Sequence, residues 1–184
     1  MDRSNHYEAA FEAYLRWHRY CYVAVDETRR AMLGEKRVKS LDFIVYGEPA
    51  ARLLIDVKGR RFPSGSPDRP RRVWECWSTY DDIEGLQSWL GLFGSGYTGL
   101  LVFTYQLMPG IELPTDTLDL FTFRGRRYLY RAIEVQDYQM HMRLRSPKWG
   151  TVGLSRVDFR RLVQPLHHFL GGPAAMPEEP VFQP

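Results

Sequence analysis

A long stretch without a charged residue, 86–111, limits the folds that this sequence can adopt. Its length alone would suffice for a membrane span. Glycines and glutamines interrupt it, however, so we expect a helix that ends near Phe93, a Gly-Ser-Gly turn and a buried strand over 97–105. A helix followed by a fully apolar strand indicates an α/β protein with a core of its own and no membrane segment.

The length and composition agree with a single globular unit. The chain has 184 residues, of which 44% are hydrophobic and 26% charged, and its net charge of +3 is only mildly basic. Its two cysteines, Cys21 and Cys76, have no zinc-ligand spacing and cannot build a disulfide framework. The charged N-terminus lacks the apolar region of a secretory signal. We therefore expect a protein of a reducing compartment, the cytoplasm.

The apolar periodicity predicts helices and strands in alternation along the first part of the chain. A helix is expected over 5–19, a β-like segment over 20–25 and a short helical turn in the polar segment that follows. Three strands should then precede the helix that Asp81 or Asp82 caps. These strands are predicted over 41–46, 53–58 and 73–79, with an Arg- and Pro-rich loop, expected to be mobile, before the last.

The remainder of the chain is expected to extend or cover this core. Antiparallel strands are predicted over 118–123, 128–135 and 139–144, with a turn at 124–126. Ser155 can cap a last helix over 157–170. We expect one domain over 1–170, with its core over about 5–106 and a C-terminal extension over about 107–170. The Pro-rich tail 171–184 should be disordered.

The segment that bears the chemistry is the strand pair around Asp56. Side chains alternate along a strand, so Asp56 and Lys58 share one face of LLIDVK. A five-residue loop over 47–51 would pair Tyr46 with Arg52, which places Asp42 directly opposite Asp56. Like charges across a ladder are unfavourable unless a cation lies between them. The sequence therefore predicts that Lys58 and a divalent metal ion occupy this face.

Carboxylate and carbonyl oxygens are the ligands that a partly hydrated Mg²⁺ prefers. Asp42 and Asp56 supply two of them, and the Val57 carbonyl is a plausible third. Mn²⁺ can take the same place. Lys58 can then orient the attacking water or help to deprotonate it.

Asp42, followed after thirteen residues by Asp56-Val57-Lys58 at the end of an apolar run, resembles the signature of the PD-(D/E)xK nuclease superfamily. The order of predicted elements also resembles the αβββαβ restriction-endonuclease-like core of that superfamily, a central mixed sheet flanked by helices. The chain has Leu41 where proline is usual before the first acid, and an aspartate at position 56 where glutamate is commoner. The resemblance covers about residues 5–106.

This resemblance implies further site residues. An acidic residue of the first helix often completes the site, and AAFEAYLR is similar to the helix-one pattern of archaeal Holliday junction resolvases, which selects Glu12, with Glu8 as the alternative. Gln87 matches an accessory glutamine on the helix after the third strand. The opening HYEAAFE resembles the motif that names the uncharacterised HYExAFE family, which carries no assigned activity.

The expected activity is metal-dependent phosphodiester hydrolysis by a DNA endonuclease, with DNA favoured over RNA. Relatives that pair their sites across two strands imply a homodimer. Basic side chains beside the site are candidate contacts to the nucleic-acid backbone. They are Arg60, Arg61, Arg69, Arg71 and Arg72.

Other interpretations remain open. Asp42 can be a turn residue, Glu8 and Glu12 can belong to a solvated helix face, and Gln87 can be an ordinary helix residue. The basic clusters can be solvated surface. The nuclease-like scaffold can also serve as a non-catalytic module that binds nucleic acid or protein, or as a phosphohydrolase of small molecules.

Overall fold

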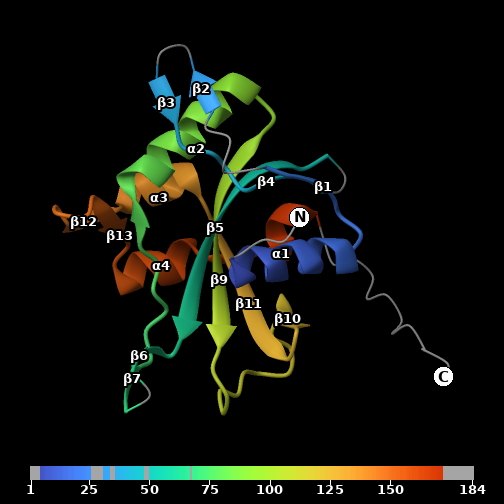
Figure 1. Cartoon of the computed structure of the whole chain (residues 1–184), viewed down its shortest axis with the longest axis vertical. Helices are drawn as coiled ribbons and strands as arrows, with labels where there is room; N and C mark the ends of the chain where they lie inside the picture. Colours follow the sequence, from blue (N-terminus) through green and yellow to red (C-terminus); the bar gives the residue numbers. More distant parts are fainter. Residues whose placement is uncertain (1–4, 26–30, 34–35, 48–49, 67, 172–184) are drawn as a thin grey trace.

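The computed structural model describes residues 5–25, 31–33, 36–47, 50–66 and 68–171. A curled seven-stranded mixed sheet runs through the molecule in the order β1-β4-β5-β9-β11-β10, and β14 pairs with β11 (Figure 1). Its strands are β1 (Cys21–Ala24), β4 (Phe43–Tyr46), β5 (Arg52–Phe62), β9 (Thr98–Leu107), β10 (Leu120–Phe123), β11 (Arg126–Glu134) and β14 (Gln164–Pro165). Of the tail predicted over 171–184, residues 172–184 lie outside the described residues.

Helices cover both faces of this sheet (Figure 1). One face carries α1 (His6–Trp17) and α5 (His167–Leu170), and the other carries α2 (Tyr80–Phe93), α3 (Val135–His141) and α4 (Arg156–Leu162). Strand alternation divides β5 between two cores: Ile55 packs with α1, whereas Leu54 packs with α2. The expected α/β architecture is confirmed, and α1, β1, β4, β5, α2 and β9 supply its αβββαβ core.

The strand register around the candidate residues is as predicted. β1, β4 and β5 pair antiparallel, and Tyr46 pairs with Arg52 and Phe43 with Ile55 across the β4–β5 hairpin. β5 then pairs parallel with β9 through the α2 crossover. The β5–β9 pair lies in the middle of the sheet. Leu53, Leu54 and Ile55 pair with both β4 and β9, whereas Asp56 and Lys58 pair with β9 alone.

The predicted strand over 73–79 is wrong, because only β8 (Ser78–Thr79) is extended and paired, and it belongs to a small separate sheet. Side chains satisfy the preceding carbonyl groups in place of a ladder. The Tyr105 hydroxyl donates to the Glu75 carbonyl at 2.9 Å, and the Tyr138 hydroxyl donates to the Cys76 carbonyl at 2.7 Å. The first of the three core strands is instead β1.

The Arg- and Pro-rich segment is also more regular than predicted. β5 continues to Phe62, and a hairpin of β6 (Ser64–Ser66) and β7 (Arg69–Arg71) follows. In the polar segment 26–40 the described residues hold a second hairpin, β2 (Ala31–Leu33) and β3 (Lys36–Val38), where a helical turn was expected.

Two C-terminal predictions need correction. Residues 139–144 were expected to be a strand, but α3 extends to His141. The strand β12 (Arg143–Ser146) begins after it and pairs with β13 (Thr151–Gly153). The helix expected over 157–170 is divided into α4 and α5 by β14, because Pro165 lacks the amide hydrogen that a continuous helix needs. Ser155 caps α4 as predicted.

Within the described part of the chain, no helix is both long and apolar enough to cross a membrane. Residues 86–111 form most of α2 and all of β9, as their glycine pattern predicts. The side chains of Leu100, Leu101, Val102 and Phe103 on β9 are fully buried.

Candidate functional site

Asp56 and Lys58 form a buried ion pair on the face of β5 that α2 covers. The Lys58 Nζ lies 2.7 Å from Asp56 Oδ2 and 2.9 Å from Oδ1. Only 6% of Asp56 is exposed. Their spacing of two along one strand turns both side chains to the same face, as alternation requires.

Asp42 reaches the same part of β5 from the neighbouring hairpin strand. Its backbone N–H donates to the Ile55 carbonyl at 2.9 Å, and its Oδ2 accepts a hydrogen bond from the Val57 N–H at 2.6 Å. The residue is 3% exposed. The structure thus brings Asp42 against Val57, the residue between Asp56 and Lys58.

Asp82 is a further acid at this position, and sequence reasoning had assigned it only the capping of a helix. Its Oδ2 lies 3.0 Å from Lys58 Nζ and accepts from the Ser78 hydroxyl at 2.8 Å. It also completes a capping box with Thr79 at the start of α2, and Lys39 donates to its other oxygen. Lys58 therefore lies between two buried carboxylates, Asp56 and Asp82.

Burial and charge act against each other in this cluster. Burial raises the pKa of Asp56 above its usual 3.8, although Lys58 opposes this shift. Burial also acts on Asp82, but Lys58, Lys39 and the Thr79 amide outweigh it and hold the pKa of that carboxyl well below its usual value. Burial would lower the pKa of Lys58, but Asp56 and Asp82 raise it, so the amine is protonated at neutral pH.

The acidic residues of α1 lie elsewhere. Glu12 Oε1 accepts hydrogen bonds from Arg16 Nη2 at 2.6 Å and from the Tyr22 hydroxyl at 2.9 Å. Glu8 accepts from the Asn5 side chain. Because α1 packs on the sheet face opposite the Asp56 side chain, the structure does not bring Glu12 to the Asp56–Lys58 pair (Figure 1).

Gln87 is positioned on α2, where its side-chain amide donates to Gln139 of α3. This contact joins two helices on the same face of the sheet. Gln87 therefore helps to hold the helical layer over Asp56, and its described hydrogen bond is with a neighbouring helix.

The five arginines predicted to contact the nucleic-acid backbone have different environments in the structure. Arg60 is largely enclosed: its guanidinium lies 3.8 Å from the centre of the Trp77 ring and donates to the Trp77 carbonyl. Arg61 is exposed, with Nη2 3.6 Å from Met108 Sδ. Arg69, Arg71 and Arg72 are exposed on or beside the β6–β7 hairpin.

The donor chemistry of Asp42 and Asp56 suits a hard divalent cation. No group of three His, Cys, Asp or Glu side chains that could hold a metal occurs among the described residues. An ion held by only two carboxylates would keep several water or substrate oxygens in its shell, which is the usual coordination of Mg²⁺ in phosphoryl-transfer sites.

Comparison with known proteins supports the fold. No family model matches the chain, and the search of curated proteins finds no similar sequence. Among solved structures, the chain is similar to Hjc of Archaeoglobus fulgidus, a Holliday junction resolvase from an archaeal hyperthermophile, with a TM-score of 0.51 and 13% identity. The match covers 90% of this chain and 98% of that protein. The chain therefore has a resolvase-like fold.

Proposed function

We propose that this protein hydrolyses phosphodiester bonds of nucleic acid with the help of a divalent metal ion, most simply as a DNA endonuclease. The observation that carries the proposal is the buried Asp56–Lys58 pair beside Asp42 on the central hairpin of a resolvase-like fold. Burying an ammonium and carboxylates together is costly, and active sites are places where such buried, interacting charges gather.

In this proposal Asp42 and Asp56 would hold Mg²⁺ or Mn²⁺, with the Val57 carbonyl as a further ligand. When bound there, the ion would supply Lewis-acid chemistry: activation of water and neutralisation of charge on the phosphate. Lys58, kept protonated by its two carboxylates, positions the attacking water and stabilises the negative charge that develops on the phosphoryl oxygens. Glu12, or Glu8, would join only after a rearrangement of α1, because its present hydrogen bonds lie on the other face of the sheet.

The second candidate function is a non-catalytic module on the same scaffold. It is favoured by one contact: Asp82 lies 3.0 Å from Lys58 Nζ and thus engages the amine that the reaction would use. In that case Lys58 is a structural cation that neutralises two buried acids. Nucleic-acid binding without metal-dependent cleavage would identify this function.

The two functions are separated by a cleavage panel. Four-way junctions, flaps, duplexes and single strands of DNA, and matching RNA, are incubated with Mg²⁺, with Mn²⁺ or with EDTA. We expect cleavage that needs the metal and that Asp56→Asn and Lys58→Met reduce by at least about a hundredfold. Asp81→Asn and Lys148→Met remove equivalent charges from exposed positions and should leave the rate unchanged.

The partner predictions are part of this proposal. DNA should be preferred over RNA, and two copies of the chain should act together on the two strands of one substrate. Sedimentation of the protein with and without a four-way junction tests the second statement, and a single copy on each junction would contradict it.

A further inference from the structure

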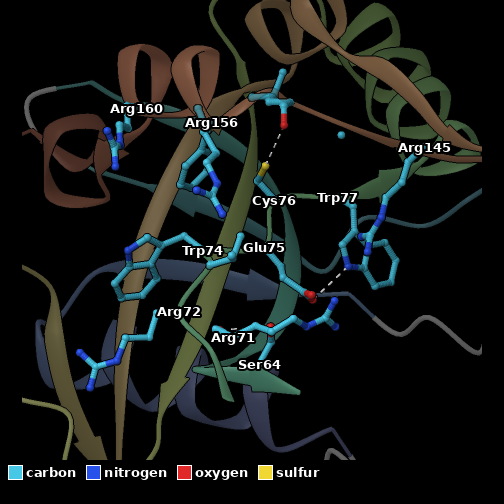
Figure 2. Close-up of a pocket in the computed structure, with 14 residues that line it drawn as sticks. Ser64, Arg71, Arg72, Trp74, Glu75, Cys76, Trp77, Arg145, Arg156 and Arg160 are labelled. Atoms are coloured by element: carbon cyan, nitrogen blue, oxygen red, sulfur yellow. Dashed lines mark hydrogen bonds between the residues drawn. The ribbon is translucent and has the colours of Figure 1, made fainter. Parts of the chain in front are cut away.

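A cavity of about 300 Å³ lies outside the Asp56–Lys58 cluster, on the same side of the sheet. Its wall is the irregular segment 72–77, together with the end of the β6–β7 hairpin, β12, β13 and α4. Figure 2 shows arginine side chains around the labelled residues of that segment. They are Arg71, Arg72, Arg145, Arg156 and Arg160.

These five arginines give the cavity a strong excess of positive charge. Among the described residues Glu75 is the only acid in its lining, and its Oε2 accepts from the Trp77 indole N–H at 3.3 Å. Within the described ranges, none of the five guanidinium groups forms an ion pair with a carboxylate, and all five residues are exposed. Like charges gathered in a concave site raise the local concentration of anions, so the cavity favours a polyanionic ligand.

Two tryptophans supply aromatic surface in the same lining. Phe62 stacks on Trp74 with the ring centres 3.6 Å apart and the planes within 3° of parallel, which fixes that indole in place. The guanidinium of Arg60 lies 3.8 Å from the centre of the Trp77 ring, and that of Arg145 lies 5.4 Å from it. Aromatic rings and guanidinium planes are the surfaces on which unpaired bases stack.

The size and charge of the cavity distinguish between forms of this ligand. A volume of about 300 Å³ is at the small end of ligand sites, which suits one nucleotide and excludes a duplex. Five arginines against one glutamate exceed the charge of a single phosphate group. Successive phosphates of one strand therefore match the site better than a free mononucleotide does.

The cavity also adjoins the candidate catalytic cluster. Arg60 follows Lys58 by two residues on the same face of β5 and packs against Trp77. The next residue, Ser78, donates to Asp82, which contacts Lys58. A nucleic-acid strand bound in the cavity would thus pass close to the Asp56–Lys58 pair where it emerges from the cavity.

We propose that this cavity binds an unpaired nucleotide in a single-stranded segment of nucleic acid, with its base against the tryptophan–arginine wall and the neighbouring phosphates on the five arginines. The inference rests on the proposed function in taking nucleic acid as the ligand. It defines the substrate class more narrowly: strands with an unpaired segment next to the cleavage point.

Fluorescence anisotropy with the full chain in EDTA tests this inference, because binding is then measured without cleavage. The probes are a labelled oligothymidylate and a labelled blunt hairpin duplex, each titrated at several salt concentrations. The double variant Arg156→Ala/Arg160→Ala should bind the oligothymidylate about tenfold more weakly. The slope of log affinity against log salt should fall by about 1.4, at about 0.7 for each lost phosphate contact.

The matched control is Arg143→Ala/Arg161→Ala, which removes the same charge from β12 and α4. Both arginines pair with Asp158 and lie outside the cavity lining. This variant should bind the oligothymidylate as the unaltered protein does, and the two double variants should affect duplex binding equally.

Equal weakening by both double variants, or no weakening by either, would overturn the assignment of the cavity. If thymidine monophosphate displaces the labelled oligothymidylate as effectively as an unlabelled oligothymidylate does, the ligand is not a nucleic-acid strand and that assignment is overturned. Cavity-dependent binding without any metal-dependent cleavage would leave this inference standing and contradict the proposed function.

Discussion

At the scale of single residues, Lys58 is the centre of the account. The two acids Asp42 and Asp56 could be identified from spacing and strand alternation, because a hairpin with a five-residue loop allows one register. Asp82 could not be identified in the same way. Its contact with Lys58 depends on how α2 lies over β5, which local patterns do not encode, and in the sequence it reads only as a helix cap.

Asp82→Asn tests the electrostatic part of this arrangement. The variant keeps the shape of the side chain but removes the charge that faces Lys58 and Lys39, so we expect the free energy of unfolding near pH 7 to fall by about 2 kcal/mol. The folded-state pKa of Asp82 lies below its unfolded value of 3.8, so its contribution is present above that pH and is lost as the pH falls below it.

The difference in free energy of unfolding between the unaltered protein and Asp82→Asn should therefore shrink as the pH is lowered through and below 3.8. Urea unfolding at a series of pH values measures it. Asp81→Asn, at the exposed neighbouring position, is the control and should show no such dependence. A deficit that stays constant or grows in acid would show that Asp82 acts through the cap alone.

At the scale of elements, apolar periodicity predicted the helices and strands of the core correctly. Side-chain hydrogen bonds explain where the predicted strands are wrong. The alternation Met140, Met142, Leu144 indicated a strand, but Val135 and Tyr138 are buried at helical spacing and begin α3. The Tyr138 hydroxyl then donates to the Cys76 and Val152 carbonyls and ties α3 to the irregular segment before β8. Such long-range contacts cannot be predicted from either segment alone.

The packing of α1 on β5 gives a prediction at this scale. A Cβ added to Gly59 would overlap the ring of Tyr7, because that ring packs directly on the glycine. Gly59→Ala should destabilise the protein by about 1 to 3 kcal/mol through overpacking. Gly91 lies within α2 with no atom near its added Cβ, so Gly91→Ala should instead stabilise by about 0.5 to 1 kcal/mol.

Chemical denaturation of both alanine variants measures the two effects, which have opposite signs for the same substitution. A neutral Gly59→Ala would mean that α1 does not pack on β5 as described. A destabilising Gly91→Ala would place that glycine in a conformation other than helix.

At the scale of the whole molecule, the C-terminal extension belongs to the central sheet. β11 pairs with β9 from Arg127–Leu107 to Glu134–Leu100, and it also carries β10 and β14 at its other edge. Both buried clusters contain C-terminal side chains, among them Tyr130 in one and Tyr138 in the other. We therefore propose that residues 1–170 form one cooperative unit, although the sequence resemblance reaches only about residue 106.

A truncation tests whether residues 1–170 fold as one cooperative unit. Residues 1–117 retain the αβββαβ core but lose β11, which leaves the apolar strand β9 with an unpaired edge. We expect the full chain to unfold in one transition that coincides by tryptophan fluorescence and circular dichroism. The truncated chain should aggregate or lack a cooperative transition, and a cooperative fold of 1–117 would show that the extension is a separate addition.

The most direct test of the central claim is the initial rate of cleavage of a labelled four-way DNA junction as Mn²⁺ is titrated, for the unaltered protein and for Asp56→Asn. If Asp42, Asp56 and Lys58 form a metal-dependent nuclease site, the rate will rise to saturation with Mn²⁺ in the unaltered protein. The folded Asp56→Asn variant will show at least about a hundredfold less cleavage. Cleavage of equal rate in both proteins, or none by either at saturating Mn²⁺ despite junction binding, would contradict the claim.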